Sequence, residues 1–226
     1  MERIDTAART TPVKLLIFDL DGTLADTIWG IRDGVNLTME KYGFPTHSYE
    51  GIRTRIGNGA RDLIRRAMPD GAAEDKALWD RVYADYDRLY ATTYTNCTVY
   101  DNMAQTLVTL KKRGYFLAVL SNKQDHYVKT MARELFGEEL FSFVAGQTDL
   151  PKKPDPTVPR MIAEGLGFRA EECAFVGDSE VDVKTACNAG MLSVACSWGY
   201  RERSLLIETG AQVVADAPVE LLGLFA

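Results

Sequence analysis

The sequence is poor in the residues that several classes of functional site require. Its 226 residues include only four cysteines and two histidines. The cysteines, which show no CxxC spacing, are Cys97, Cys173, Cys187 and Cys196. That spacing disfavours a thiolate zinc site, and we expect the thiols to be reduced and structural. With His47 and His126 as the whole supply of imidazole, the chemistry is expected to run without histidine.

The chain also lacks an excess of positive charge and any long apolar run. Its formal net charge is −6 and its isoelectric point is near 5.1, which argues against nucleic acid or an anionic membrane as the main partner. No run approaches the ~18 to 20 apolar residues of a membrane-spanning helix. Residues 1–12 carry no apolar stretch behind their charges, so no secretory signal is expected. We predict a cytoplasmic monomer or homodimer, with a tail before a first strand at Val13.

Short apolar runs alternate with helical patterns over most of the chain. This alternation predicts βαβ units and a mostly parallel sheet that is covered on both faces, an α/β fold with a Rossmann-like core. The runs that we interpret as strands are 13–18, 115–122, 141–147, 173–178, 191–197 and 211–216.

Residues 27–97 have a different pattern. Apolar residues recur there at helical spacing, beginning at Ile28, Leu63 and Leu78, and no strand pattern is found. The interval is too long for an ordinary loop. We therefore predict two domains: a catalytic core formed by 1–26 and 98–226, and an inserted all-helical cap formed by 27–97.

Polar residues follow the predicted strands, where ligands bind in open α/β sheets. The first strand is followed by Asp19 and Asp21, whose side chains share one face of an extended chain. Two carboxylates this close need a shared positive charge. Later strands are followed by Ser121 and Asn122 and by Asp178.

These residue types suit a phosphate reaction that uses magnesium. Asp19, Asp21 and Asp178 form an oxygen cage typical of Mg²⁺, and Lys153 adds a compensating charge. Further groups could donate hydrogen bonds to phosphate oxygens, and these are the side chains of Thr23, Ser121 and Asn122.

A two-step mechanism follows from these roles. Asp19 would attack phosphorus and form an aspartyl-phosphate. Asp21 would protonate the leaving alkoxide and then accept a proton from the hydrolytic water. Lys153 and Mg²⁺ would stabilise the charge on the transferring phosphoryl group.

Four motifs in this order resemble those of the haloacid dehalogenase superfamily of phosphatases. They are DLDGT (19–23), SN (121–122), KP (153–154) and GDSEVD (177–182). The resemblance implies that Asp19 is the nucleophile, that Asp21 is the acid and base, and that Ser121 and Lys153 hold phosphate. It implies Mg²⁺ ligation by Asp19, the Asp21 carbonyl and Asp178, with Asp182 nearby. The helical insertion is similar to the C1 cap of that superfamily.

Three further segments resemble phosphoglycolate phosphatases within the superfamily, namely 55–68, 110–123 and 197–200. Tyr100-Asp101-Asn102 stands where Tyr-Pro-Gly is usual, and Ser121 where threonine is more common. We therefore expect hydrolysis of a small phosphorylated metabolite, phosphoglycolate first. The alternatives are a phosphatase for pyrophosphate, a sugar phosphate or a nucleotide monophosphate, a phosphomutase, and a non-catalytic regulatory binder.

The predicted cap offers candidates for substrate recognition. Arg53 and Arg55 precede a Gly-Asn-Gly loop that contains Asn58, and an arginine there could pair with a substrate carboxylate. The competing interpretation is that both arginines lie on a solvated helix face. Lys152 competes with Lys153 for one role, and the KPxP context favours Lys153.

Overall fold

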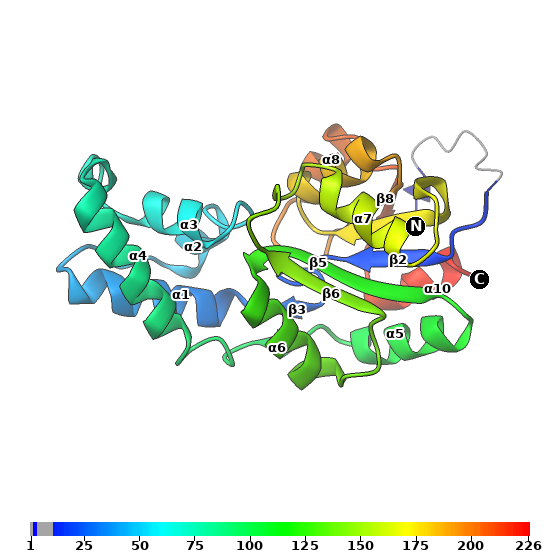
Figure 1. Cartoon of the computed structure of the whole chain (residues 1–226), viewed down its shortest axis with the longest axis horizontal. Coiled ribbons are helices and arrows are strands. Elements are labelled where there is room, and N and C mark those ends of the chain that lie inside the picture. Colours follow the sequence, from blue (N-terminus) through cyan, green and yellow to red (C-terminus); the bar gives the residue numbers. More distant parts are fainter. Residues whose placement is uncertain (1, 4–10) are drawn as a thin grey trace. The chain divides into compact units, whose positions relative to one another are not determined.

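The computed structural model describes residues 2–3 and 11–226, and these form two compact units (Figure 1). Unit 1 runs to Ala25 and resumes as Val99–Ala226, and unit 2 is Asp26–Thr98. The insertion expected from the sequence, 27–97, differs from unit 2 by one residue at each end.

Unit 1 is built on a seven-stranded sheet in the order β1-β9-β8-β7-β2-β5-β6. Its strands are β1 Glu2–Arg3, β2 Leu15–Phe18, β5 Phe116–Gln124, β6 Phe143–Gln147, β7 Cys173–Gly177, β8 Leu192–Cys196 and β9 Val213–Ala215. All neighbouring pairs are parallel except β1 with β9. The predicted α/β class with a mostly parallel sheet is confirmed.

The burial of the central strand β2 accounts for its apolar composition. It reads Leu-Leu-Ile-Phe, and all four side chains are fully buried, as in parallel sheets whose two faces are both covered by helices. Figure 1 shows α7 and α8 on one face of the sheet and α5 and α6 on the other. The helices of unit 1 are α5 Met103–Lys112, α6 Asp125–Phe136, α7 Thr157–Gly165, α8 Glu180–Ala189, α9 Arg203–Glu208 and α10 Leu221–Leu224.

The N-terminal segment differs from the prediction. Residues 1–12 are expected to be a tail, yet β1, Glu2–Arg3, pairs antiparallel with β9. Residues 1 and 4–10 of the expected tail lie outside the described residues. A two-residue pairing leaves no periodic pattern to detect, and it satisfies backbone groups at the otherwise open edge of β9. The first core strand, β2, begins at Leu15 rather than Val13.

Unit 2 is helical, and its helices bury the apolar stripes seen in the sequence. The elements are α1 Ile28–Lys41, α2 Tyr49–Arg53, α3 Ala60–Ala67, the 3₁₀ turn η1 Ala72–Glu74 and α4 Lys76–Tyr90. Helix α2 was not predicted, because five residues are too few to form a stripe. Where the chain passes between the units, β3 Ala25–Asp26 and β4 Thr98–Val99 form a two-stranded sheet.

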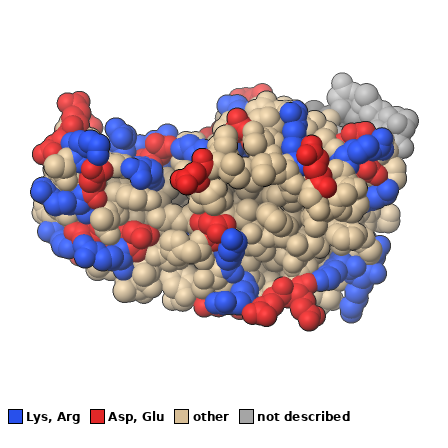
Figure 2. Space-filling model, viewed as in Figure 1, with Lys and Arg blue, Asp and Glu red and all other residues tan. Residues whose placement is uncertain are grey.

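The surface agrees with the modest overall charge. On the face shown in Figure 2, acidic and basic side chains are interspersed rather than gathered into one extended patch of a single sign. Over the described residues, no helix has both the length and the apolar character needed to cross a membrane.

Candidate active site

The sheet register brings the predicted site residues to one edge of unit 1. Phe18, the last residue of β2, is aligned with Val119 of β5 on one side and with Val176 of β7 on the other. The three strands are parallel, so the residues that follow them emerge together. Asp19, Asp178 and the Ser121–Lys123 end of β5 therefore lie in one neighbourhood.

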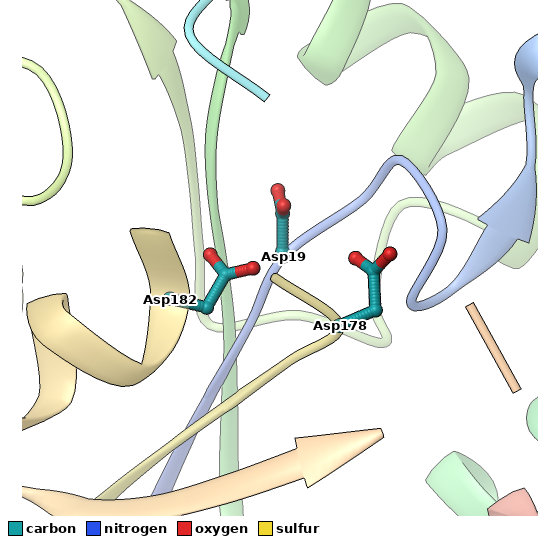
Figure 3. Close-up of side chains that lie close together, drawn as sticks. All are labelled: Asp19, Asp178 and Asp182. Carbon is teal, nitrogen blue, oxygen red and sulfur yellow. The ribbon is translucent and has the colours of Figure 1, made fainter. Parts of the chain in front are cut away.

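Three carboxylates converge at this edge (Figure 3). Asp19 follows β2, Asp178 follows β7 and Asp182 lies in the first turn of α8. One carboxylate oxygen from each lies within 4.8 Å of the others, and all three residues are buried. Like charges this close are unfavourable without a cation.

Lys153 supplies one positive charge to the cluster. Its Nζ lies 3.0 Å from Asp19 Oδ1 and 2.7 Å from Asp182 Oδ1, and the lysine side chain is 2% exposed. Burial opposes the charge on this ammonium, but the two carboxylates outweigh burial and raise the pKa of Lys153. Lys153 is thus held as a cation between Asp19 and Asp182.

One lysine does not compensate three buried carboxylates. Desolvation raises the pKa of Asp19 to about 7, against the lowering effect of Lys153. Desolvation, together with the charges of Asp182 and Asp19, raises the pKa of Asp178 well above its usual value. The excess of negative charge at this point is what a divalent cation with oxygen ligands would relieve.

Asp178 is oriented by groups from two other segments. The Thr23 hydroxyl donates to Asp178 Oδ1 at 3.1 Å, and the Tyr200 N–H donates to Asp178 Oδ2 at 2.7 Å. Space around Asp178 is tight, since a Cβ added to Gly199 would lie 2.3 Å from the Asp178 Cβ. The Thr23 hydroxyl thus orients Asp178 in the structure, and its predicted contact with phosphate stays a prediction.

Asp182 is held as a structural partner of Lys153. Ser179 caps α8: its side chain accepts from the Asp182 N–H, and the Asp182 carboxylate accepts from the Ser179 N–H and hydroxyl. This capping box leaves Asp182 Oδ1 directed at Lys153. Both oxygens of Asp182 are therefore already engaged within the protein.

The residues after β5 have separate tasks. The Asn122 side chain pairs with the backbone of Lys153, donating to its carbonyl at 3.1 Å and accepting from its N–H at 2.9 Å. The Asn122 amide thus fixes the loop that carries Lys153, and its predicted contact with phosphate stays a prediction. Ser121 is 3% exposed and lies beside these groups.

Asp21 contacts a lysine to which the sequence motifs assign no role. Lys123 Nζ lies 2.9 Å and 3.2 Å from the two carboxylate oxygens of Asp21. The sequence shows Lys123 next to Asn122 but gives no sign of a contact across 102 positions. Tyr200 was missed for a different reason: it acts through its backbone N–H, which leaves no signature in residue type.

Arg55 and Asn58 belong to unit 2, whereas the clustered carboxylates belong to unit 1. The guanidinium of Arg55 donates to the carbonyls of Arg66 and Gly51, at 2.9 Å and 2.5 Å. These bonds tie together the segments around α2 and α3. A contact of Arg55 or Asn58 with substrate stays a prediction.

Comparisons with known proteins agree with this architecture. Residues 16–196 match the model of the haloacid dehalogenase-like hydrolase family. The phosphoglycolate phosphatase of Pseudomonas syringae pv. tomato is 36% identical over 208 residues, which cover 90% of this chain and 76% of that protein. The phosphoglycolate phosphatase of Colwellia psychrerythraea is 32% identical, over 92% of this chain and 95% of that protein.

Solved structures give the same result. The crystal structure of a predicted phosphoglycolate phosphatase from Haemophilus somnus superposes with a TM-score of 0.85 at 29% identity, covering 96% of this chain and all of that one. The match of the family model over most of the chain, the relatives above 30% identity and the shared fold lead to one assignment. The chain belongs to the haloacid dehalogenase-like hydrolase family.

Proposed function

We propose that this protein hydrolyses small phosphomonoesters, with phosphoglycolate as its preferred substrate. The observation that carries the proposal is the buried group of Asp19, Asp178 and Asp182, two of which contact Lys153, with Asp21 two residues beyond Asp19. The choice of phosphoglycolate is supported by the names of the relatives at 32–36% identity.

In the first step, Asp19 attacks phosphorus. The hydrogen bonds that the described residues give to its carboxylate, from the Leu20 N–H and from Lys153, both reach Oδ1, which leaves Oδ2 for the attack. The bond between phosphorus and the ester oxygen breaks, its electron pair stays on that oxygen, and Asp21 protonates it.

In the second step, water attacks the aspartyl-phosphate. Asp21 accepts the proton of the water, and the bond from phosphorus to Asp19 breaks with its electron pair returning to the carboxylate. Lys153 stays beside Asp19 in both steps and offsets negative charge on the phosphoryl oxygens.

The donor set fits Mg²⁺, because three buried carboxylates lie together, only two of them contact Lys153, and the pKa values of Asp19 and Asp178 are raised. Asp19 and Asp178 would hold the ion, with the Asp21 carbonyl beside them, while Asp182 orients Lys153. When bound, the ion stabilises charge on the phosphoryl oxygens. Asn122 and Thr23 hold the loops that carry Lys153 and Asp178, and Ser121 offers a hydroxyl to phosphate.

The test is phosphate release from a panel that includes phosphoglycolate, pyrophosphate, a sugar phosphate and a nucleotide monophosphate, with Mg²⁺ or with EDTA. Asp19→Asn is expected to lower kcat by about 10³-fold or more, because the nucleophile is lost. Asp149→Asn, at an exposed position of unit 1, is the matched control and should keep wild-type turnover.

Each outcome separates one alternative. A sharp optimum on phosphoglycolate supports the proposal in full, and an optimum on another ester keeps the chemistry while replacing the substrate. Activity that requires a bisphosphate activator would indicate a phosphomutase. Binding of Mg²⁺ and phosphate without any turnover would indicate a regulatory binder.

A further inference from the structure

Lys123 is a buried cation that the proposed reaction does not use. It lies near the end of β5, and its side chain is 7% exposed, whereas that of Asp21 is 20% exposed. The ammonium thus lies inside the protein while the carboxylate that it contacts is still reached by solvent. A lysine is rarely buried in this way unless it is paired.

The contact fixes the orientation of Asp21. Both carboxylate oxygens lie within hydrogen-bond distance of Lys123 Nζ, at 2.9 Å and 3.2 Å. The terminal torsion of an aspartate is otherwise broad, and a charge-assisted contact to both oxygens narrows it. Lys123 belongs to β5, whose residues Phe116–Val119 pair with β2, the strand that leads to Asp19 and Asp21.

We propose that Lys123 is a positioning residue that holds Asp21 for the hydrolysis of the aspartyl-phosphate. The inference rests on the proposed function, since it assigns a partner to the base of the second step. In that step the water oxygen bonds to phosphorus, its proton passes to Asp21, and the electron pair of the breaking bond returns to Asp19. A proton acceptor must lie within hydrogen-bond reach of the attacking water, and Lys123 keeps Asp21 at that place.

The experiment separates the two steps by using acetyl phosphate, whose leaving group is a carboxylate and needs no proton. Phosphate release and the fraction of acid-quenched protein that carries a phosphoryl group are measured with Mg²⁺ present. In Lys123→Met we expect turnover to fall by about 10²-fold, the lower range for general acid–base catalysis. Phosphoenzyme should accumulate, because its formation is spared and its hydrolysis is slow. Lys123→Arg, which keeps the charge, should restore part of the turnover.

Three comparisons complete the design. Asp21→Asn should also accumulate phosphoenzyme, and the double variant Asp21→Asn with Lys123→Met should lose little more than Asp21→Asn alone, because the two residues act together. Lys129→Met is the matched control: it removes an exposed lysine that pairs with Asp125 on α6, and it should behave as wild type. The phosphoenzyme fraction is compared with turnover in the same sample, so partial misfolding does not imitate the result.

Two results would overturn the inference: a loss of turnover without phosphoenzyme, or unchanged turnover in Lys123→Met. If wild type forms no phosphoenzyme and hydrolyses no ester of the panel, the proposed function itself fails. That outcome is distinct, because it appears before any change at Lys123 is made.

Discussion

At the residue scale, Gly199 leaves no room for a side chain beside Asp178, a candidate metal ligand. A Cβ at position 199 would lie 2.3 Å from the Asp178 Cβ and 2.4 Å from the carbonyl oxygen of Gly22. A backbone carbonyl cannot move aside as the end of a flexible side chain can. A methyl group here is therefore expected to displace the Asp178 carboxylate.

We predict that Gly199→Ala weakens Mg²⁺ binding by about 10- to 100-fold, the range found when groups that orient metal ligands are changed. Isothermal titration with Mg²⁺ measures the affinity directly, without relying on activity. Gly165→Ala is the control, because the added Cβ at that site in α7 would meet nothing within 4 Å beyond its chain neighbours and the backbone of its own helix. Equal Mg²⁺ affinity in Gly199→Ala and wild type would contradict the assignment of Asp178.

Residue identity predicts some of these partners and not others. Asp19, Asp178 and Lys153 can be picked out because carboxylates and lysines after strands are visible in the sequence. Thr23 and Asn122 carry groups that could touch phosphate, and the sequence gives no sign that both also bond to other site residues. Which of two compatible partners a hydroxyl or an amide takes depends on the placement of distant loops, and the sequence does not contain that placement locally.

At the element scale, α1 and α4 of unit 2 are joined by a buried carboxylate. Asp85 of α4 accepts from the hydroxyl of Tyr42, which follows α1, at 2.7 Å, and it pairs with Lys41 at 2.7 Å and with Arg88. The hydrogen bonds from Lys41 and Tyr42 are the main reason that the pKa of Asp85 is lowered to about 2. The carboxylate thus helps to fix one helix against the other.

Asp85→Asn is predicted to lower the free energy of unfolding of unit 2 by about 1–2 kcal/mol at pH 7, since charge-assisted hydrogen bonds are lost. A carboxyl whose pKa is lower in the folded state stabilises the fold above its unfolded pKa of about 4. That contribution is lost as the pH falls through about 2. The difference between variant and wild type should therefore shrink between pH 4 and pH 2.

Urea unfolding followed by hydrogen exchange in α1 and α4 measures this effect. Asp80→Asn removes an exposed pair with Lys76 in the same helix, and it should change stability by less than about 0.5 kcal/mol. If the difference in unfolding free energy between Asp85→Asn and wild type stayed constant with pH, the charge of the carboxylate would not contribute to stability.

Elements with a long hydrophobic pattern could be predicted from the sequence, and short elements could not. The buried run of β2 and the apolar stripes of α1, α3 and α4 are long enough to be recognised. Helix α2 has five residues, and its clearest signal is Ser48, whose side chain accepts from the Gly51 N–H as an N-cap. Strand β1 has two residues and pairs with the distant β9, so it has no local signal.

At the scale of the whole molecule, the candidate metal ligands all belong to one of the two units. Asp19 and Asp178 lie in unit 1, whereas unit 2 contributes none of the three clustered carboxylates. A ligand stabilises the cooperative unit that binds it. Mg²⁺ is therefore expected to slow hydrogen exchange in β2 and β7 and to leave α3 and α4 unchanged.

Exchange measured by mass spectrometry, with Mg²⁺ or with EDTA, tests this expectation. Asp178→Asn should remove the added protection in unit 1, which shows that the effect comes from this site. If Mg²⁺ slowed hydrogen exchange equally in both units, the expectation that only unit 1 responds would be wrong. The sequence predicts an insertion over 27–97 because strand patterns stop before this interval and return after it.

The two crossings also bear on how such a chain could arise. In unit 1 the Tyr100 N–H donates to the Leu24 carbonyl, and in unit 2 the Gly30 N–H donates to the Asn96 carbonyl. Each unit thus holds its own two chain ends together, so joining them adds little loop-closure entropy to either. A helical segment can be gained, lost or exchanged at this point without altering the strand order of the sheet. The hydrolytic residues and the inserted helices are therefore free to diverge at different rates.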